Sequence, residues 1–317
     1  HMTALIGKKI VHWGAEFLKN PERKTLRGIT FDPSPNAPAG MLNKWYGFPI
    51  SPKTENEVSE NAVKGFKLYL SHIKENICNG NEDHYKWLTN YLVHMIQFPG
   101  DKPGVSLTLI GEEGTGKNAF MHPFKMLLGK SYFETSSIDH VLGSFNANIE
   151  SAIAIVLDEA HSPGDKKEEG ALKALITSPE IVVNQKGVPA YSVKSCCRVF
   201  MLTNNENVLK ASKESRRYTV LGVGNKRMQD HEYFGEMLSG MDAGGTNLLY
   251  QYLLDYKVDV KMAHKHLETA KLVEQRERTA ISDPLDNFLI SVLSNGYFPG
   301  MDSWQDKIDK DALHSMF

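Results

Sequence analysis

The sequence predicts an α/β fold built around a parallel sheet, and three observations support this prediction. Between residues 103 and 227, short apolar runs alternate with helix-compatible runs, as the crossovers of a parallel sheet require. The segment Gly111–Asn118 (GEEGTGKN) joins one apolar run to a helical run. On either side of this region the chain is typical of helical or irregular structure, which confines the expected sheet to the middle of the chain.

Composition limits the classes of protein that fit. The chain has 317 residues, of which 41% are hydrophobic and 23% charged, as expected for a globular protein of one large or two ordinary domains. The net charge of −2 excludes an overall basic fold, so any surface that binds nucleic acid has to be local. No apolar stretch approaches the roughly 20 residues that span a bilayer, and we expect no membrane partner.

Cysteine usage indicates a reducing compartment. The three cysteines are Cys78, Cys196 and Cys197, and the adjacent pair lies in an apolar run, which argues against a disulfide framework or a zinc site. We expect structural cysteines and a cytoplasmic protein. His1 and Met2 are typical of a cleaved tag, so we expect the chain to be part of a longer protein.

Two regions precede the predicted sheet. Residues 1–58 are interrupted by prolines and glycines, which predicts an irregular segment, and its aromatic residues favour a segment anchored on the rest of the protein. Residues 59–102 carry apolar side chains at helical spacing in two runs, 63–77 and 85–96, and predict a helical collar.

The core and the C-terminal region follow. The strands expected in the core, residues 103–227, are 105–110, 153–157, 199–203 and 218–223, and the expected helices are 117–128 and 168–177. Residues 228–317 are expected to be helical, through 234–238, 248–254 and 262–279. The last part, 282–317, has short apolar groups that would fit the start of a winged-helix module.

The segment Gly111–Asn118 has the spacing of a phosphate-binding loop. Its glycines allow backbone N–H groups to surround a polyphosphate, its lysine reaches the outer phosphates, and the following helix aims the positive end of its dipole at them. The expected nucleotide-binding residues are Gly111, Glu112, Glu113, Gly114, Thr115, Gly116, Lys117 and Asn118. Asn118 stands where such loops normally carry the Ser or Thr that contacts magnesium, which leaves either an unusual active site or a degraded one.

A second motif is the apolar run 152–159 (AIAIVLDE), which predicts a buried strand that ends in two carboxylates. At the end of a strand, Asp158 can hold magnesium through water, and Glu159 can orient and deprotonate the water that attacks the terminal phosphate. The string DEAH also occurs in large two-lobed helicases, but their Gln-x-x-Gly-Arg-x-Gly-Arg motif is absent from this sequence. His161 is therefore treated as an ordinary residue.

Polar residues also flank two later strands. The apolar run that starts at residue 198 ends in the polar pair Thr203-Asn204. At the edge shared with the phosphate loop, Asn204 can reach the terminal phosphate or its attacking water; Asn205 is the alternative. Arg216 and Arg217 precede the next strand. An arginine there suits a neighbouring subunit's nucleotide, where it would stabilise charge on the transferring phosphoryl group. The sequence does not distinguish between the two arginines.

The motifs GEEGTGKN, IVLDE, MLTN and SRRY, in this order, resemble those of the superfamily 3 helicases, the ring-forming ATPases of small DNA viruses, phages and plasmids. The resemblance covers about residues 10 to 280 and is closer to the phage and plasmid branch fused to primase–polymerase domains, because 27–52 is similar to the segment before the collar there. It implies an AAA+-like phosphate-loop core, ATP and Mg²⁺, a hexameric ring around single-stranded DNA, and an N-terminal primase–polymerase. A phage-encoded protein would act in the host cytoplasm.

The resemblance also implies a hairpin whose basic tip grips DNA, placed between the acidic pair and the strand that ends in asparagine. Residues 180–194 (EIVVNQKGVPAYSVK) have two β-like runs around Lys186, which is the candidate for the tip, and Lys194 and Arg198 are weaker candidates. Several copies of one lysine around a channel would make a positive ring despite the acidic monomer.

The expected function is a DNA-stimulated ATPase that moves along single-stranded DNA and separates strands in phage or plasmid-type replication. The expected catalytic residues are Lys117, Asp158, Glu159, Asn204, Arg216 and Arg217, with Asn118 and Asp158 at the metal. An amide oxygen is a poorer ligand than the usual hydroxyl arrangement, so slow hydrolysis is expected. The alternative is a DNA-encircling, ATP-binding platform for a fused polymerase, with little or no unwinding.

Overall fold

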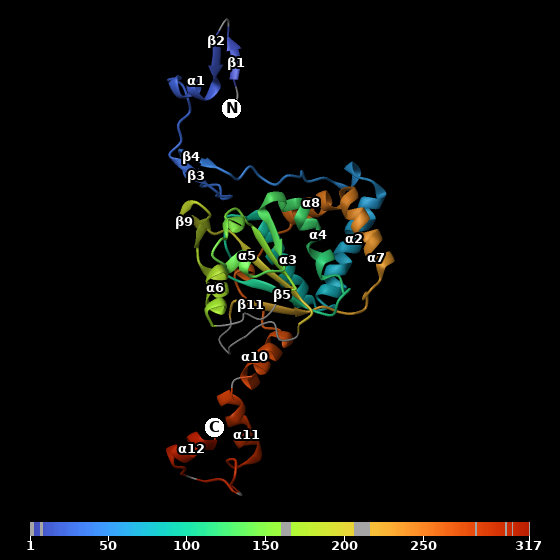
Figure 1. Ribbon diagram of the computed structural model, residues 1–317. Helices are drawn as coiled ribbons and strands as arrows, with labels where there is room; N and C mark the ends of the chain where they lie inside the picture. The colour runs from blue at the N-terminus through green and yellow to red at the C-terminus, as the bar shows by residue number, and fades with distance from the viewer. Residues whose placement is uncertain are drawn as a thin grey trace.

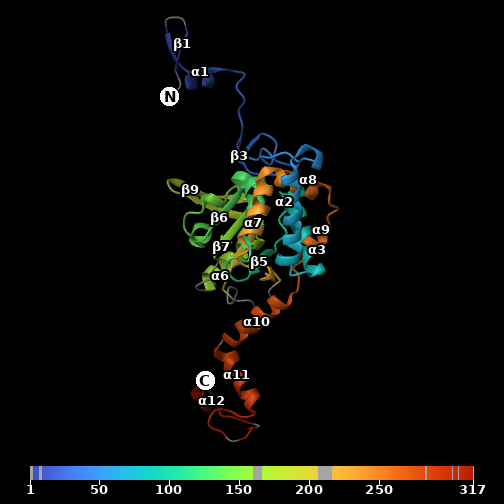
Figure 2. The same ribbon diagram turned by 90° about the vertical axis from the view of Figure 1, so that its right-hand side faces the viewer.

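The computed structural model describes residues 3–6, 9–159, 166–205, 216–282, 284–301, 303–305 and 307–316. Figure 1 shows a compact centre from which an N-terminal arm and a C-terminal arm extend at opposite ends, and Figure 2 shows the same arrangement from the side. The centre contains the sheet, the collar and the glycine-rich segment Gly111–Asn118, so it is the part that positions a site.

The centre is organised around a five-stranded sheet in the order β11-β5-β10-β7-β6, in which all neighbouring strands are parallel. The strands are β5 (Ser106–Ile110), β6 (Tyr132–Thr135), β7 (Ala154–Asp158), β10 (Arg198–Thr203) and β11 (Tyr218–Gly222). The three middle strands are buried almost throughout, because helices cover both faces of a parallel sheet. The predicted α/β fold with a parallel sheet is confirmed. Edge strand β6 was not predicted, since its run YFET is short and only partly buried.

The order of the strands creates a switch in direction beside β5. From β5 the chain crosses to β6 at the far edge, returns through β7 to β10, and then passes over β5 to reach β11. The connections that leave the adjacent strands β5 and β10 therefore run to opposite sides. A crevice outside the carboxyl ends of the strands is expected at such a point, and ligands of open α/β sheets bind there.

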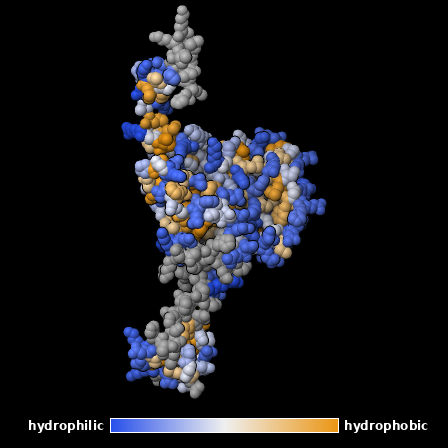
Figure 3. Space-filling model, viewed as in Figure 1, coloured by the Kyte–Doolittle hydropathy of each residue, from blue (hydrophilic) through white to orange (hydrophobic). Residues whose placement is uncertain are grey.

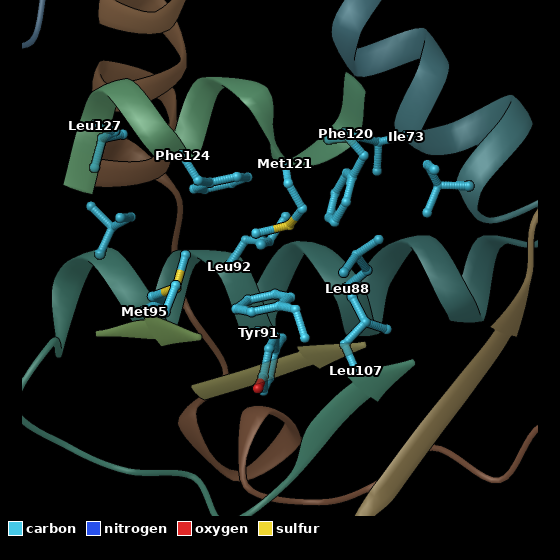
Figure 4. Packing of buried hydrophobic residues seen from close by; sticks show 14 of the residues in the cluster. Ile73, Leu88, Tyr91, Leu92, Met95, Leu107, Phe120, Met121, Phe124 and Leu127 are labelled. Atoms are coloured by element: carbon cyan, nitrogen blue, oxygen red, sulfur yellow. The ribbon is translucent and has the colours of Figure 1, made fainter. Parts of the chain in front are cut away.

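One face of the sheet is covered by two helices that lie one above the other. Helix α3 (Glu82–Gln97) lies against the sheet, and α4 (Lys117–Leu128) lies on α3 (Figure 4). The shared core contains Ile73, Leu88, Tyr91, Leu92, Met95, Leu107, Phe120, Met121, Phe124 and Leu127. The collar helix therefore belongs to the core of the sheet domain.

Further helices surround this layer. They are α2 (Glu60–Ser71), the π-helical turn η2 (His72–Ile77), α7 (His231–Gly240), the turn η5 (Met241–Gly245), α8 (Thr246–Asp255) and α9 (Val260–Ala263). Helix α2 packs closely on α7, and the contact leaves no room for a side chain at Gly65: a Cβ atom there would lie 2.5 Å from the backbone of Gly240. Helix α2 with η2, and helix α3, lie over the two runs, 63–77 and 85–96, that are expected to be helical, and η2 is a widened end of the first.

The other face of the sheet has its own core. Apolar side chains of β7, β10 and β11 pack there against helices α6 (Lys166–Thr177) and α10 (Ala270–Ser282), beside the short α5 (Asp139–Leu142). The prediction of one helix over 262–279 is wrong, because residues 264–269 between α9 and α10 are not helical and bond to β11 instead. Leu267 N donates to Thr219 Oγ1 at 2.9 Å and Thr269 Oγ1 donates to Val220 O at 2.5 Å, and these bonds break the helix.

The N-terminal region is anchored through part of its length. Its elements are β1 (Thr3–Ile6), β2 (Lys9–His12), α1 (Trp13–Lys19), β3 (Gly28–Thr30), β4 (Met41–Asn43) and the 3-10 turn η1 (Glu55–Glu57). Edge-on aromatic contacts run from Phe31 through Trp45 and Phe48 to Tyr250 on α8, with centroid distances of 5.9, 5.0 and 5.5 Å. Trp13 and Phe17 in the arm are exposed instead, and Figure 3 shows hydrophobic residues at the surface there.

The C-terminal arm consists of α11 (Pro284–Asn295) and α12 (Lys310–Met316), within the segment expected to begin a winged-helix module. Across the described residues, no helix has both the length and the apolar character needed to cross a membrane. Cys78, Cys196 and Cys197 are buried free thiols, in agreement with the structural role expected for them.

Candidate nucleotide-binding site

The glycine-rich segment forms a tight loop between β5 and the first turn of α4. Gly114 and Gly116 have φ values of 77° and 88°, a left-handed conformation that strains any residue with a Cβ atom. A Cβ atom on Gly116 would also lie 2.5 Å from the ring of Phe234 and 2.6 Å from that of His72. Glycine is therefore needed here for conformation and for space, and the loop leads directly into the N-terminus of α4.

Three carbonyl groups of the loop are held from outside. Gln229 N donates to Gly114 O at 3.0 Å, Asn76 Nδ2 donates to Thr115 O at 2.7 Å, and His72 Nε2 lies 3.1 Å from Gly116 O. Because C=O and N–H point in opposite directions across a trans peptide, the N–H groups of residues 115–117 are directed to the other, concave side of the loop. The loop thus has the N–H arrangement that binds an anion.

Lys117 lies across the mouth of the loop. Its Nζ atom donates to the carbonyl oxygens of Gly111 at 2.7 Å and Glu112 at 2.9 Å, and Thr115 Oγ1 also donates to Glu112 O, at 2.7 Å. Burial lowers the pKa of the Lys117 ammonium, while Asp158 and Glu113 oppose this shift. The lysine is thus held next to the loop, where a phosphate oxygen can replace its carbonyl partners.

The acidic pair lies at the same edge of the sheet. Asn118, in the first turn of α4, donates from Nδ2 to Asp158 Oδ2 at 3.0 Å. Glu159 follows with a left-handed φ of 55° and donates from its backbone N to Asp158 Oδ1 at 3.1 Å. A positive φ is uncommon for a residue with a side chain and is often found at functional sites. The fold therefore joins the end of β7 to the start of α4 through Asn118 and Asp158.

The donor atoms at this position fit a magnesium ion. Magnesium prefers oxygen ligands and keeps several of its waters. Asp158 supplies a carboxylate, and Asn118 has its amide oxygen left, because its nitrogen is used in the bond to Asp158. These two residues would hold the ion beside the phosphate loop, and the ion would neutralise phosphate charge there.

A cleft of about 330 Å³ brings these groups together. Its lining residues are Glu113, Gly114, Gly116, Lys117, Asn118, Ala119, Asp158, Glu159, Leu202, Thr203, Asn204 and Phe234. Strand β10 lies between β5 and β7, so its last residues separate the phosphate loop from the acidic pair, and Asn204 enters the cleft from there. Asn205 is not among the lining residues; its N–H donates to Thr203 Oγ1 at 3.0 Å.

The two arginines lie at the opposite edge of the sheet. Strand β11 runs parallel to β5, and Arg217 O accepts from Ser106 N at 2.8 Å at the amino ends of both strands. Five residues of strand separate this point from the phosphate loop, a distance of about 16 Å. Arg216 is exposed and Arg217 is half-buried. Neither arginine lines the cleft of its own chain.

The predicted hairpin also starts from the amino edge. Strands β8 (Glu180–Gln185) and β9 (Val188–Lys194) pair antiparallel, and Gly187, with φ of 80°, forms the turn beside the exposed Lys186. The sequence thus located the hairpin and its tip. Lys194 is paired with Asp32 at 2.9 Å.

Arg198, one of the weaker candidates for the DNA contact, is not available for such a contact. Its side chain is buried, and Nη2 donates to the carbonyl oxygens of Phe98 at 3.0 Å and Asp101 at 2.7 Å. It serves to hold the segment after α3 against the start of β10. His161 lies outside the described residues.

Among the described residues, one set of three side chains has the spacing of metal ligands: His94, Asp101 and His264. Arg198 Nη2 donates to His94 Nδ1 at 3.0 Å, so His94 Nε2 carries the ring proton and donates to Asp101 Oδ2 at 3.2 Å. Because both nitrogens of His94 are engaged and a guanidinium lies beside it, this set is a hydrogen-bonded structural link. Sequence reasoning missed it, since the residues are far apart along the chain.

The fold and this cleft define an α/β protein with a five-stranded parallel sheet and a glycine-rich loop at its switch point. Residues 109–217 match a family of unknown function (DUF5906). No curated protein matches the sequence.

Solved structures of the NrS-1 C-terminal region are similar to this chain. The apo structure of its residues 305–718 gives a TM-score of 0.64 at 18% identity, over 92% of this chain and 70% of that chain. Two further apo structures of the same region, both described as the A form, give TM-scores of 0.66 and 0.63 with the same identity and coverage. At this identity the likeness concerns the fold.

Proposed function

We propose that this chain is a ring-forming ATPase of the superfamily 3 helicase type, which moves along single-stranded DNA during phage or plasmid-type replication. One observation carries the proposal: Lys117, Asn118, Asp158 and Asn204 line a single cleft at the carboxyl edge of the sheet. A phosphate loop, a metal position and a polar strand end together serve phosphoryl transfer. The NrS-1 C-terminal region has a similar fold, which agrees with the α/β core that the proposal requires.

Each residue in the cleft has a separate task in this proposal. The N–H groups of the loop and the Lys117 ammonium bind the phosphates, and Asp158 with the Asn118 amide oxygen holds Mg²⁺. Glu159 takes the proton of the attacking water, because it follows Asp158 at the strand end and lines the cleft. The Asn204 amide donates to the terminal phosphate or orients that water.

Hydrolysis requires a second subunit in this proposal. Arg216 and Arg217 lie at the amino edge, about 16 Å from the phosphate loop of their own chain. In a head-to-tail ring, the amino edge of one subunit can face the carboxyl edge of the next, so that one arginine stabilises charge on the transferring phosphoryl group. ATP hydrolysis would then depend on assembly.

DNA binding is assigned to the hairpin. Lys186 is exposed at its tip, and a head-to-tail ring would place several copies around one channel. Such a ring of lysines binds the phosphate backbone independently of base sequence. ATP hydrolysis at the subunit interface would move the hairpins and, with them, the DNA.

Replacement of the loop lysine tests this function. Lys117→Ala is expected to abolish DNA-stimulated ATP turnover, because the outer phosphates lose their cation; release of inorganic phosphate measures this. Lys130→Ala, which changes an exposed lysine just beyond the end of α4, is the matched control and should keep full turnover. Unchanged DNA-stimulated hydrolysis in Lys117→Ala would contradict the assignment.

The second candidate function is an ATP-binding platform that encircles DNA and supports a fused polymerase without unwinding. The contact from Asn118 to Asp158 favours it, because an amide that holds the metal-binding carboxylate can slow turnover. A strand-displacement assay separates the two. Displacement that depends on ATP supports the helicase, and ATP hydrolysis without displacement supports the platform.

A further inference from the structure

The two arms of the chain leave the centre from opposite edges of the sheet. The N-terminal segment meets the centre at the amino edge, where Asp32 pairs with Lys194, shortly before the start of β10. The C-terminal arm follows α10, whose Lys271 lies at the carboxyl end of β11, 3.9 Å from where a Cβ atom on Gly222 would be. From these edges the arms project in opposite directions in both Figure 1 and Figure 2, so the arms of one chain lie far from each other.

Helix α1 in the N-terminal arm presents apolar side chains to solvent. Trp13, Phe17 and Leu18 are 51%, 57% and 64% exposed, and α1 has no buried residue. Trp13 and Phe17 lie one turn apart and line, together with Pro21, a groove of about 470 Å³. A seven-residue helix beside a two-stranded hairpin is marginal in water, so the arm requires a surface to pack against.

Helix α11 in the C-terminal arm has an apolar face of the same kind. Its Val292 is buried within the arm, whereas Leu289, Ile290 and Leu293 are 44% to 70% exposed. These three residues are spaced so that they share one face of the helix. The second arm therefore offers an exposed apolar stripe that a groove can receive.

The charges of the two arms are opposite. Residues 3–27 contain six lysines or arginines and two glutamates, whereas residues 284–316 contain five aspartates and two lysines. Two N-terminal arms would repel each other, and an N-terminal arm would attract a C-terminal arm. Because the two arms of one chain lie at opposite ends, the attracted arm has to belong to another copy.

We propose that α1 of one chain docks onto α11 of a second copy, with the groove lined by Trp13 and Phe17 over the stripe of Leu289, Ile290 and Leu293. This inference rests on the head-to-tail arrangement of the proposed function, in which the amino edge of one subunit faces the carboxyl edge of the next. The contact itself requires neither ATP nor DNA. It is small beside the roughly 800 Å² per partner of a stable interface, so it adds to the contact between the centres.

Cysteine cross-linking of the full chain tests this contact. Glu16→Cys in the groove and Ser294→Cys beside Leu293 place two thiols across it, and the native cysteines are buried. A disulfide requires Cα atoms within about 7 Å, so oxidation of the double variant by copper phenanthroline should link successive copies into a ladder. Each single variant should give at least about tenfold less cross-linked protein, as should Glu16→Cys combined with Ser71→Cys, an exposed serine of the centre.

Removal of the two aromatic rings gives a second measurement. When Trp13→Ala/Phe17→Ala is added to the two cysteines, the cross-linked fraction should fall by about tenfold, because buried aromatic anchors carry much of the binding energy of a contact. The melting temperature should not change, since no side chain of α1 is part of a core.

The outcomes separate this inference from the proposed function. Cross-linking no higher than in the Ser71→Cys control, in protein that hydrolyses ATP, would overturn the arm contact and leave the proposed function intact. Cross-linking that is the same with and without Trp13 and Phe17 would also overturn it, because the groove would not be the docking surface. An unmodified chain without ATP turnover would overturn the proposed function, whether or not the arms cross-link.

Discussion

The two edges of the sheet carry different chemistry. At the carboxyl edge, β5, β7 and β10 bring the phosphate loop, Asp158, Glu159 and Asn204 into one cleft. At the amino edge lie the hairpin with Lys186 at its tip and the arginine pair before β11. The comparison teaches that, under the proposed function, one chain has the groups that would bind a nucleotide, whereas Arg216 and Arg217, which would complete phosphoryl transfer, do not line its own cleft.

The largest effect should come from the carboxyl edge. Glu159→Gln removes the proposed base and keeps the size of the side chain, so ATP turnover should fall by about 10² to 10⁴-fold while ATP binding is retained. Single-turnover kinetics and calorimetry measure the two properties. Glu232→Gln, at an exposed position of α7, should change neither. Full turnover in Glu159→Gln would assign the base to another residue.

A smaller effect should come from the amino edge. Lys186→Ala should weaken binding of single-stranded DNA by about tenfold or less at every sequence and reduce its dependence on salt, because a phosphate contact is lost. Fluorescence anisotropy at several salt concentrations measures this, with Lys130→Ala as control. Basal ATP turnover without DNA should not change. Equal DNA affinity in the variant and the unmodified chain would place the DNA contact elsewhere.

Each edge also contains one buried neutral histidine, and acid should destabilise both. Burial lowers the pKa of His72, behind the phosphate loop, and of His94, beside Arg198, to about 4, with Arg198 contributing to the second shift. Below about pH 6.5 the unfolded chain binds a proton at each of these histidines, whereas the folded chain does not until the pH approaches 4. The contribution of the two neutral rings to the free energy of unfolding is therefore fully present above about pH 6.5 and is lost as the pH falls toward 4.

The expected loss at pH 5 is about 2 kcal/mol of unfolding free energy for each histidine. Urea unfolding at pH 7 and pH 5 measures it. In His94→Gln the dependence on pH should be roughly halved. A stability that is constant between pH 7 and pH 5 would contradict the burial of neutral rings at both edges.

The sequence predicted what depends on local pattern. Helix α4 begins and ends where expected, because a glycine-rich loop precedes it and Gly129 follows it. The polar strand ends could be predicted to meet in one cleft, since parallel strands share an edge. The hairpin was also located, because Lys186-Gly187 separates two β-like runs.

What the sequence did not reveal depends on contacts between distant segments. His72, Asn76 and Gln229 support the phosphate loop from outside, and their residue types gave no signal. For His72 and Asn76, the sequence signal is their spacing of four positions beside an apolar helical stripe. Arg198 is a weaker candidate for the DNA contact in the sequence, because burial of a guanidinium against backbone carbonyls cannot be read from its neighbours in the chain.

A subunit-mixing experiment tests the division between the edges most directly. Lys117→Ala rings lack an intact carboxyl edge, and Arg216→Ala/Arg217→Ala rings lack an intact amino edge, so each alone should have little ATP turnover. If the two edges complete one site between neighbouring subunits, rings assembled from an equal mixture should regain about a quarter of normal turnover, because one interface in four pairs two intact edges. Turnover in the mixture no higher than in the separate variants would contradict the account.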